Sequence, residues 1–404
     1  MNFSKRTAWD LRETAWAREL GRIRASGAKL FDLTASNPTH CGFRYEPAAV
    51  LSPLVSPRAL GYSPDPRGSI AARQAVCRYY AAHDVETDPA NLLLTTGSSE
   101  AYSFLFRLLA DPGDEILIAQ PGYPLFDFLA QLDDVHLAPY ELFYDPGWDH
   151  AWQIDFDGLR RRLRASEAAA RRPRAILVVH PNNPTGHLTP KAERENLQEL
   201  CREHGLALIV DEVFLDYGFG APAESFAADR HDVLTFVLSG VSKIAALPQM
   251  KVAWIAAFGP GPAREEALAR LEVIADTFLS VNAAADGALP AWLDGRHALQ
   301  RQIRERTARN LAALDAMLQP KPNAPAEAGA VTRLHLQAGW YAVLHVPAIL
   351  PDEENALALL TGHGVAVHPG SFFGFPQPGR LVVSLLAPEE EFTGGISRLL
   401  EYFS

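Results

Sequence analysis

Short apolar runs alternate with helical patterns between about Asn91 and Phe258. This alternation is typical of a mostly parallel β-sheet whose strands are connected by crossover helices. Six apolar runs predict strands in this part of the chain: residues 91–96, 115–120, 174–180, 206–213, 233–238 and 251–258. Between two of them, Thr189 and Pro190 provide an N-cap and a first-turn proline for a helix that Gly205 ends. The central part is therefore predicted to be α/β.

The pattern changes after Pro290, where a long charged helix is predicted over residues 297–318. A Pro- and Ala-rich stretch at 319–330 indicates a surface loop. Strands at 334–346, 364–369 and 379–386 and a last helix at 391–402 then predict a smaller α+β domain. Because chain termini often lie close together, we predict a large domain of residues 48–290 and a small domain formed by 1–47 and 291–404.

Size and charge narrow the possible functions. A chain of 404 residues exceeds the size at which one hydrophobic core stops growing, so a two-domain enzyme is feasible. The formal net charge of −11 repels phosphate backbones and anionic lipids, so neither nucleic acid nor a membrane is expected as a partner. No apolar stretch is long enough to predict a membrane span, and the start of the sequence lacks the apolar core of a signal peptide.

The spacing of the cysteines and histidines argues against a disulfide-stabilised protein and against a metalloprotein. Cys41, Cys77 and Cys201 form an odd set without paired spacing, so neither a disulfide framework nor a thiolate zinc site is indicated, which fits a cytoplasmic protein. The histidines show no HExxH or similar spacing, so no metal site is expected.

Two motifs that could bind a ligand directly follow predicted strands. Gly97, Ser98 and Ser99 begin a helix whose free N–H groups, hydroxyls and positive dipole end could bind a phosphate. The alternative is that Ser98 is an ordinary N-cap. Tyr123, in the turn PGYP, stands at a strand's carboxyl end and could stack on a flat ring, although packing is the commoner role.

Three more polar residues follow the next strands. Asn183, in HPNNPTG, could hydrogen-bond a phenolic ligand oxygen or simply belong to an Asn-Pro turn. Asp211 ends an apolar run, where a buried charge needs a partner. Lys243, in SGVSK with Ser239 and Ser242, could be reactive or a solvated loop residue.

The order of these five motifs resembles that of the fold-type I pyridoxal-phosphate enzymes, specifically the class I/II aminotransferases, from Ser36 to the C-terminal helix. The resemblance implies a seven-stranded, mostly parallel sheet and pyridoxal 5'-phosphate as the cofactor. Lys243 would hold it as a Schiff base and move the Cα proton, and Asp211 would pair with the ring nitrogen. Asn183 would bond the phenolic oxygen, and Tyr123 would stack on the ring.

The resemblance also implies further contacts. Ser98 and Ser99 would bind the cofactor phosphate with help from the hydroxyls of Ser239 and Ser242. Tyr62 would reach the phosphate across a dimer interface, which implies a homodimer with shared sites. The small-domain segments that close over substrate would be Ser36-Asn37-Pro38 and Gly339-Trp340-Tyr341, with Ser36, Asn37 and Trp340 as substrate contacts.

The sequence departs from the family pattern at four positions. Phe214 stands where many members have tyrosine, which removes one hydrogen bond to the phenolic oxygen. Lys251 replaces the usual phosphate-binding arginine, and Gln249 replaces a glycine in the same turn. The arginine that grips the substrate carboxylate would fall on Val382, so Arg380, two residues earlier, could serve only through a bulge or its long side chain.

An amino-acid aminotransferase with a 2-oxo acid as acceptor is the function that this pattern favours. The alternative on the same scaffold is a β-eliminating lyase of the carbon–sulfur type, because the sequence does not show which substrate bond breaks. A ligand-sensing domain fused to a DNA-binding module is disfavoured by the acidic balance and by the short segment before Ser36.

Overall fold

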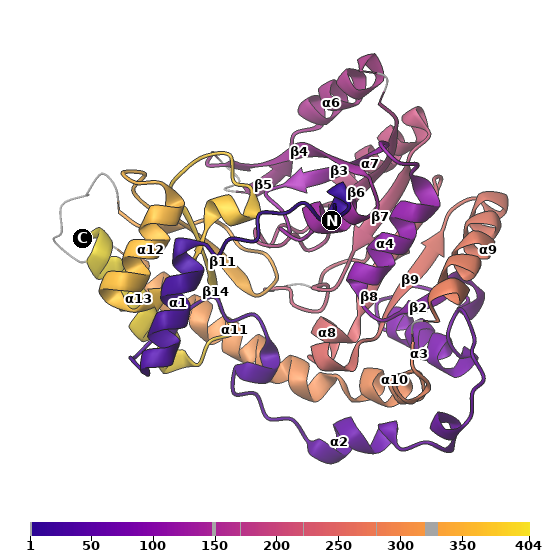
Figure 1. Cartoon of the computed structure of the whole chain (residues 1–404), viewed down its shortest axis with the longest axis horizontal. Helices are drawn as coiled ribbons and strands as arrows, with labels where there is room; N and C mark the ends of the chain where they lie inside the picture. The colour runs from indigo at the N-terminus through magenta and orange to yellow at the C-terminus, as the bar shows by residue number, and fades with distance from the viewer. Residues whose placement is uncertain (1, 148–150, 170, 221, 280, 320–329) are drawn as a thin grey trace.

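The computed structural model describes residues 2–147, 151–169, 171–220, 222–279, 281–319 and 330–404. Figure 1 shows a large sheet with its helices on one side of the molecule, and a smaller group of elements from both chain ends on the other. Residues 320–329, most of the predicted Pro- and Ala-rich loop, lie outside the described part. No helix in the described residues is both long and apolar enough to cross a membrane.

The large sheet contains eight described strands in the order β2-β9-β8-β7-β6-β3-β4-β5. Their bounds are Leu92–Thr95 (β2), Glu115–Gln120 (β3), His136–Asp145 (β4), Ala151–Ile154 (β5), Pro173–Val179 (β6), Ala207–Asp211 (β7), Thr235–Gly240 (β8) and Ala253–Phe258 (β9). β3, β4, β6, β7 and β8 pair in parallel, whereas β9 runs antiparallel to β2 and β8. All six predicted strands are confirmed within a few residues at their ends.

The sheet exceeds the expected seven strands because β5 folds back antiparallel on β4 at the edge. In β4, exposed positions alternate with the buried Ala138, Tyr140 and Leu142, and the strand contains Pro139. This half-buried pattern lacks the continuous apolar run of a central strand. The pair was therefore missed from the sequence.

Helices cover both faces of this sheet. Alternate residues of each strand enter two separate cores, as Leu93 and Leu94 do in β2. The helices of this part are α2 (Pro47–Leu51), α3 (Ile70–Ala81), α4 (Ser98–Leu109), α5 (Phe126–Leu132), α6 (Phe156–Ala168), α7 (Lys191–His204), α8 (Val241–Ile244), α9 (Gly261–Phe278) and α10 (Ala283–Gly295). Residues of α4 and α9 pack in one core, and residues of α3, α7 and α10 in the other. The sheet thus has the two covered faces that parallel strands require.

The start of α7 corrects one expectation. Gly205 ends the helix in a left-handed conformation, as predicted, but the N-cap residue is Pro190 and not Thr189. The Thr189 N–H instead donates to Nδ1 of the buried His180, 3.2 Å away. The helix therefore starts one residue later than predicted.

The smaller part contains an antiparallel sheet in the order β10-β11-β14-β13. Its strands are Thr332–Arg333 (β10), Tyr341–His345 (β11), His368–Pro369 (β13) and Arg380–Ser384 (β14), and the remaining pair is Phe31–Asp32 (β1) with Val365–Ala366 (β12). The helices are α1 (Ala15–Ser26), α11 (His297–Leu318), α12 (Asp352–His363) and α13 (Glu389–Phe403). β1 lies parallel to β12, so the two ends of the chain share a sheet. The long helix α11 and the last helix α13 confirm their predictions.

The single strand predicted at 334–346 is wrong, because the segment divides into a loop and β11. Its first half leaves the small sheet and bonds the large part of the chain. The Phe219 N–H donates to the Gln337 carbonyl, and the Gly339 N–H to the Tyr217 carbonyl, both at 2.8 Å. These bonds deliver Trp340 to the carboxyl edge of the large sheet.

Candidate active site

The carboxyl ends of β6, β7 and β8 form one edge of the large sheet. Val179 pairs with Asp211, and Asp211 with Leu238, so β6 and β7 end at the same level and β8 ends two residues beyond it. Asn183 and Lys243 follow the two flanking strands by a few residues. Parallel topology therefore gathers three of the predicted residues at the edge where open α/β sheets bind ligands.

Lys243 lies in α8 with its amine enclosed by aromatic rings. Its Nζ is 4.8 Å from the ring centroid of Trp340 and 5.5 Å from that of Phe214. Burial lowers the pKa of the amine to about 8, although the nearby Asp211 opposes this change. The hydroxyl of Tyr217 donates to the Lys243 carbonyl at 2.6 Å and fixes the backbone. An amine with this pKa can act as nucleophile and proton carrier near neutral pH.

Asp211 is the last residue of β7 and is only 6% exposed. Its Oδ1 accepts the Val213 N–H at 2.9 Å, and its Oδ2 accepts the Tyr102 hydroxyl at 2.5 Å. Burial raises the pKa of the carboxyl, while these two hydrogen bonds and the charge of Lys243 oppose that rise. The carboxylate is thus held by donors from two elements.

Asn183 is buried, and its Oδ1 has no hydrogen-bond partner among the described residues. Buried amide oxygens normally accept a hydrogen bond, so an unpartnered one at this sheet edge points to a polar ligand as its partner. Tyr123 is half-buried beside this edge, with its ring 5.5 Å from that of Phe126 in an edge-to-face contact. An amide and a ring face are thus available to a flat polar ligand.

Ser98 and Ser99 are the first two residues of α4, and Gly97 is the N-cap residue. The interpretation of Ser98 as an ordinary N-cap is therefore wrong. The N–H groups at the start of a helix have no intrahelical acceptors, so this turn can receive an anion. Ser242 is half-buried at the start of α8, whereas the buried Ser239 hydroxyl donates to the Glu212 carbonyl at 3.3 Å.

Lys251 closes the turn after Lys243. It is exposed and takes a left-handed conformation with φ of 54°. Gln249 lies in a short 3-10 helix, Pro248–Met250, so the turn forms without glycine at that position. The left-handed residue of this turn is thus Lys251 itself.

The small part of the chain covers the same edge. Trp340 is fully buried, with its ring against Phe214 and Tyr217 at 5.3 and 5.1 Å. Ser36 is half-buried and lies within hydrogen-bonding range of the Tyr341 hydroxyl. Asn37 is committed to its own loop, because its Oδ1 accepts both the N–H and the hydroxyl of Thr39.

Two predicted residues lie apart from this group. Arg380 begins β14, four residues and about 13 Å along the strand from Ser384, which pairs with Tyr341. The ladder between β11 and β14 has no bulge, and the Arg380 guanidinium donates to the Gly379 carbonyl. Tyr62 is 84% exposed on the surface of the large part.

Sequence reasoning missed two residues at this edge. Tyr102 contacts Asp211, and Tyr217 contacts the Lys243 backbone. Tyr102 stands four residues after Ser98, so helical spacing places it on the same face as the predicted phosphate turn. That spacing was a usable signal, whereas Tyr217 required the tertiary structure.

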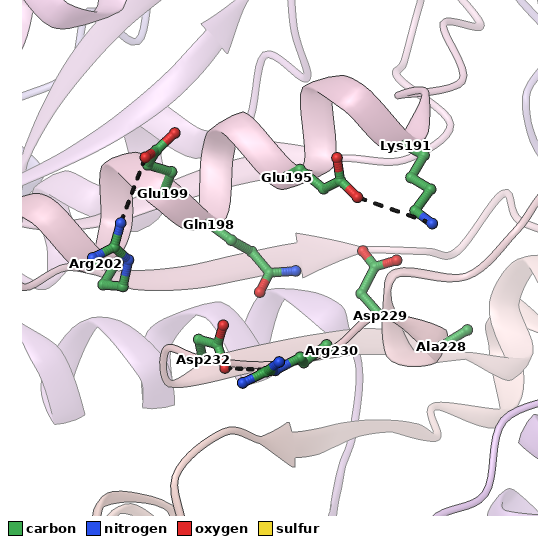
Figure 2. Close-up of a pocket in the computed structure, with 9 residues that line it drawn as sticks. All are labelled: Lys191, Glu195, Gln198, Glu199, Arg202, Ala228, Asp229, Arg230 and Asp232. Carbon is green, nitrogen blue, oxygen red and sulfur yellow. Dashed lines mark hydrogen bonds and ion pairs between the residues drawn. The ribbon is translucent and has the colours of Figure 1, made fainter.

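A separate surface hollow of about 430 Å³ lies on the outer side of α7 (Figure 2). Its charged side chains pair with one another, as Arg230 does with Asp232 at 3.0 Å and Arg202 with Glu199 at 3.5 Å. None of the predicted site residues lines it. Across the described ranges, no group of three or more His, Cys, Asp or Glu side chains could hold a metal ion.

The fold and this edge define an α/β enzyme with a shielded amine, a buried carboxylate and a helix start whose N–H groups have no intrahelical acceptors. The aminotransferase class I and II family model matches residues 33–398. The chain therefore belongs to the class I and II aminotransferases, and it is an enzyme of that type.

Known proteins resemble the chain over most of its length. The alanine aminotransferase of Mycobacterium bovis is 27% identical over 387 residues, which cover 94% of this chain and 86% of that protein. The glutamate-pyruvate aminotransferase AlaA of Escherichia coli is 28% identical over 290 residues, which cover 71% of this chain and 69% of that protein. The structure of an alanine aminotransferase from Pyrococcus furiosus has a TM-score of 0.85 at 23% identity, covering 100% of this chain and 99% of that chain. This last likeness shows the fold.

Proposed function

We propose that this protein uses pyridoxal 5'-phosphate, bound covalently through Lys243, to transfer an amino group from an amino acid to a 2-oxo acid. The observation that carries the cofactor is the shielded Lys243 amine facing Asp211, with the buried Asn183 amide, whose oxygen has no partner among the described residues, at the same sheet edge. The Lys243 amine fits the aldehyde of that cofactor and the Asp211 carboxylate fits its ring nitrogen, while an amide N–H of Asn183 would donate to its phenolic oxygen. The named relatives extend the proposal to amino-acid substrates.

Each residue has a role that follows from its position. When bound, the cofactor supplies a ring that accepts electrons from the substrate Cα. Lys243 holds the cofactor and, once released, carries the Cα proton on Nζ, for which its lowered pKa is suited. Asp211 would hold the ring nitrogen, Asn183 the phenolic oxygen and Tyr123 one ring face.

The phosphate would lie at the start of α4. Ser98 and Ser99 offer free N–H groups and hydroxyls there, and Ser242 and Lys251 could add a hydroxyl and a positive charge from the turn after β8. The Ser239 hydroxyl already donates to the Glu212 carbonyl, which makes it the weakest of the proposed ligands.

The small part would bind substrate. Trp340 excludes water from the Lys243 amine, and Ser36 with Tyr341 presents hydroxyls beside it. Asn37 would contribute through its main chain or its amide N–H, because its side-chain oxygen is bonded to Thr39. Removing water strengthens every polar contact inside the site.

The visible absorption spectrum tests this function. Purified protein mixed with pyridoxal phosphate should gain a visible band, an amino acid should abolish it, and a 2-oxo acid should restore it. Lys243→Ala should lack the band. A β-eliminating lyase would instead release the amino group as ammonia without needing a 2-oxo acid, and this result would refute transamination.

We also propose that the protein forms a homodimer in which Tyr62 reaches the partner's cofactor phosphate. Large apolar side chains of the segment around Tyr62 are more than half exposed, which is unusual for a surface that stays in water. They are Leu51, Val55, Leu60, Tyr62 and Ile70.

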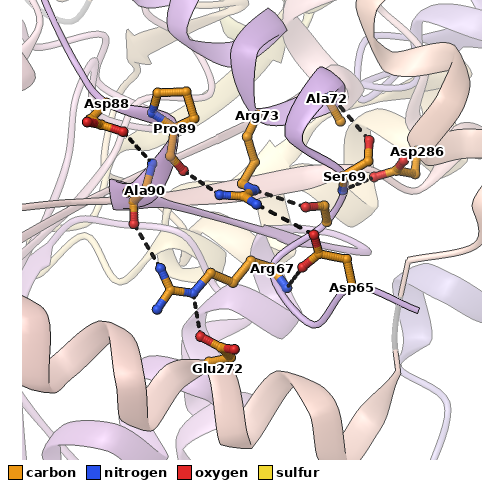
Figure 3. Close-up of polar contacts among 11 residues, drawn as sticks. Asp65, Arg67, Ser69, Ala72, Arg73, Asp88, Pro89, Ala90, Glu272 and Asp286 are labelled. Carbon is orange, nitrogen blue, oxygen red and sulfur yellow. Dashed lines mark hydrogen bonds and ion pairs between the residues drawn. The ribbon is translucent and has the colours of Figure 1, made fainter. Parts of the chain in front are cut away.

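Two arginines, Arg67 and Arg73, hold the chain that follows Tyr62 against the large part. Arg67 bonds Glu272 at 2.7 Å and the Ala90 carbonyl at 3.0 Å, and Arg73 donates to the Pro89 carbonyl at 2.8 Å (Figure 3). Tyr62 thus lines a surface hollow of about 630 Å³ on an anchored support. A second copy of the chain would cover both the hollow and the apolar side chains.

Mixing two inactive variants tests the shared site. Tyr62→Ala and Lys243→Ala are each expected to lose most activity, but a hybrid dimer would contain one site with neither defect. Recovery of activity after unfolding and refolding the mixture would support the proposal. A monomer in sedimentation equilibrium, or no recovery in mixed dimers, would refute it.

A further inference from the structure

Tyr102 has a contact that no predicted role explains. Its ring is 1% exposed in the core between α4 and the sheet, edge-to-face with Phe126 at 5.0 Å. A phenolic O–H in such surroundings needs an acceptor. The one it has is the Asp211 carboxylate, 109 residues away in the sequence and 2.5 Å away in space.

This bond fixes a carboxylate that would otherwise rotate about its Cβ–Cγ bond. The Val213 N–H holds Oδ1 from the turn after β7, and Tyr102 holds Oδ2 from α4. Each oxygen keeps a second lone pair for another donor. Two donors from different elements thus set the plane of the carboxylate, while leaving it able to accept one bond more.

The charge of Asp211 depends on the same bond. Burial raises its pKa, and the Tyr102 hydroxyl is the strongest of the groups that oppose this rise, ahead of the Val213 amide and the charge of Lys243. The titratable groups facing Asp211 are Tyr102 from α4, Tyr123 from the turn after β3 and Lys243 from α8. Glu212 is occupied elsewhere, by the Ser225 hydroxyl and the Phe226 N–H.

We propose that Tyr102 is a positioning residue, whose hydroxyl keeps Asp211 ionised and oriented to pair with the ring nitrogen of the cofactor. The inference rests on the proposed function. It also gives α4 a double role, because its first turn would bind the cofactor phosphate while its second turn orients the carboxylate that would hold the ring nitrogen. Ser98 and Tyr102 are about 6 Å apart along the helix axis.

Tyr102→Phe removes the hydroxyl and keeps the ring. We expect kcat to fall about tenfold or more, the size of a hydrogen bond to a buried charge, with KM changed less than about twofold. We also expect the Kd for pyridoxal phosphate to rise more steeply than in the wild type as the pH is lowered, because an Asp211 with a higher pKa is protonated sooner.

Tyr140→Phe is the matched control. Tyr140 is also buried in the large sheet, but its hydroxyl donates to the Leu177 carbonyl at 3.1 Å and not to Asp211. Thermal melting of both variants without cofactor measures the structural cost of losing a buried hydroxyl. A role of Tyr102 in packing alone would give the two variants the same kcat and the same pH dependence of cofactor binding, and would overturn the proposal.

A double-mutant cycle provides the second test. If Tyr102 acts through Asp211, Tyr102→Phe should have little further effect on cofactor affinity in an Asp211→Asn protein. An undiminished effect in that background would also overturn the inference. Failure of the proposed function would give a distinct result. A wild-type protein that gains no visible band with pyridoxal phosphate would refute the proposed function and, with it, the role of Tyr102.

Discussion

Replacing Lys243 with methionine is expected to make the cofactor-free protein more stable near neutral pH. The lysine amine is enclosed by Trp340 and Phe214, and burial lowers its pKa from 10.5 to about 8. At 1.36 kcal/mol per pKa unit, that change corresponds to about 3 kcal/mol of unfavourable free energy. The two cation–π contacts are favourable and offset part of it. We therefore expect Lys243→Met to raise the free energy of unfolding by about 2 kcal/mol.

The size of the stabilisation falls as the pH rises, while its sign stays the same. Below pH 8 the amine of Lys243 is protonated in the folded and the unfolded chain, so the wild type carries the full cost of burying the charge. Between pH 8 and 10.5 the folded protein releases the proton first, and the wild type gains stability relative to the variant. Above 10.5 neither state is charged and this difference disappears.

Urea unfolding of both apoproteins near pH 7 and pH 10 measures the effect. Lys191→Met is the control, because Lys191 is exposed on α7 and its removal should change stability by less than about 0.5 kcal/mol. A Lys243→Met protein no more stable than the wild type near pH 7 would falsify the reasoning, and would mean that the amine is solvated. A confirmed gain would show that the site sacrifices stability for a reactive amine.

Three other changes have defined outcomes. Gly186→Ala should lower the free energy of unfolding by about 3 kcal/mol, because φ is +69° and the new Cβ would lie 2.3 Å from the Ala338 carbonyl oxygen. Its control is Gly205→Ala, which should cost about 1 kcal/mol, because φ is +64° but no atom lies within 4 Å. Equal losses of the two variants in urea unfolding would contradict the steric argument. Glu115→Gln should destabilise the protein by about 2 kcal/mol at neutral pH, since it breaks contacts to two arginines and Ser166. This loss should fade as the pH falls through the lowered pKa of Glu115. A pH-independent loss in thermal melts would refute an ionic origin. Arg380→Met should change KM for amino acids less than about twofold, as its guanidinium donates to Gly379, whereas a tenfold increase would show that it binds the substrate carboxylate.

The sequence by itself determined the framework of the sheet and the positions of the polar residues at the carboxyl ends of its strands. Buried parallel strands are continuous apolar runs, so the polar residue that ends or follows each run is visible as an interruption. Asp211 ends β7, and Asn183 and Lys243 follow β6 and β8. Because the carboxyl ends of parallel strands share one edge, local patterns were sufficient to predict that these three residues meet.

Tertiary structure alone decided features whose partners are distant in the sequence. The segment before Trp340 is apolar enough for a strand, but its backbone bonds Tyr217 and Phe219 instead. β4 and β5 form an edge whose alternating pattern is weak. In the sequence, Tyr102 is indistinguishable from the other core aromatic residues of α4. Only the tertiary structure shows that its hydroxyl bonds Asp211 across the core. Hydrophobic periodicity shows which side of an element is buried, but the polar group that a buried hydroxyl meets depends on how the elements pack.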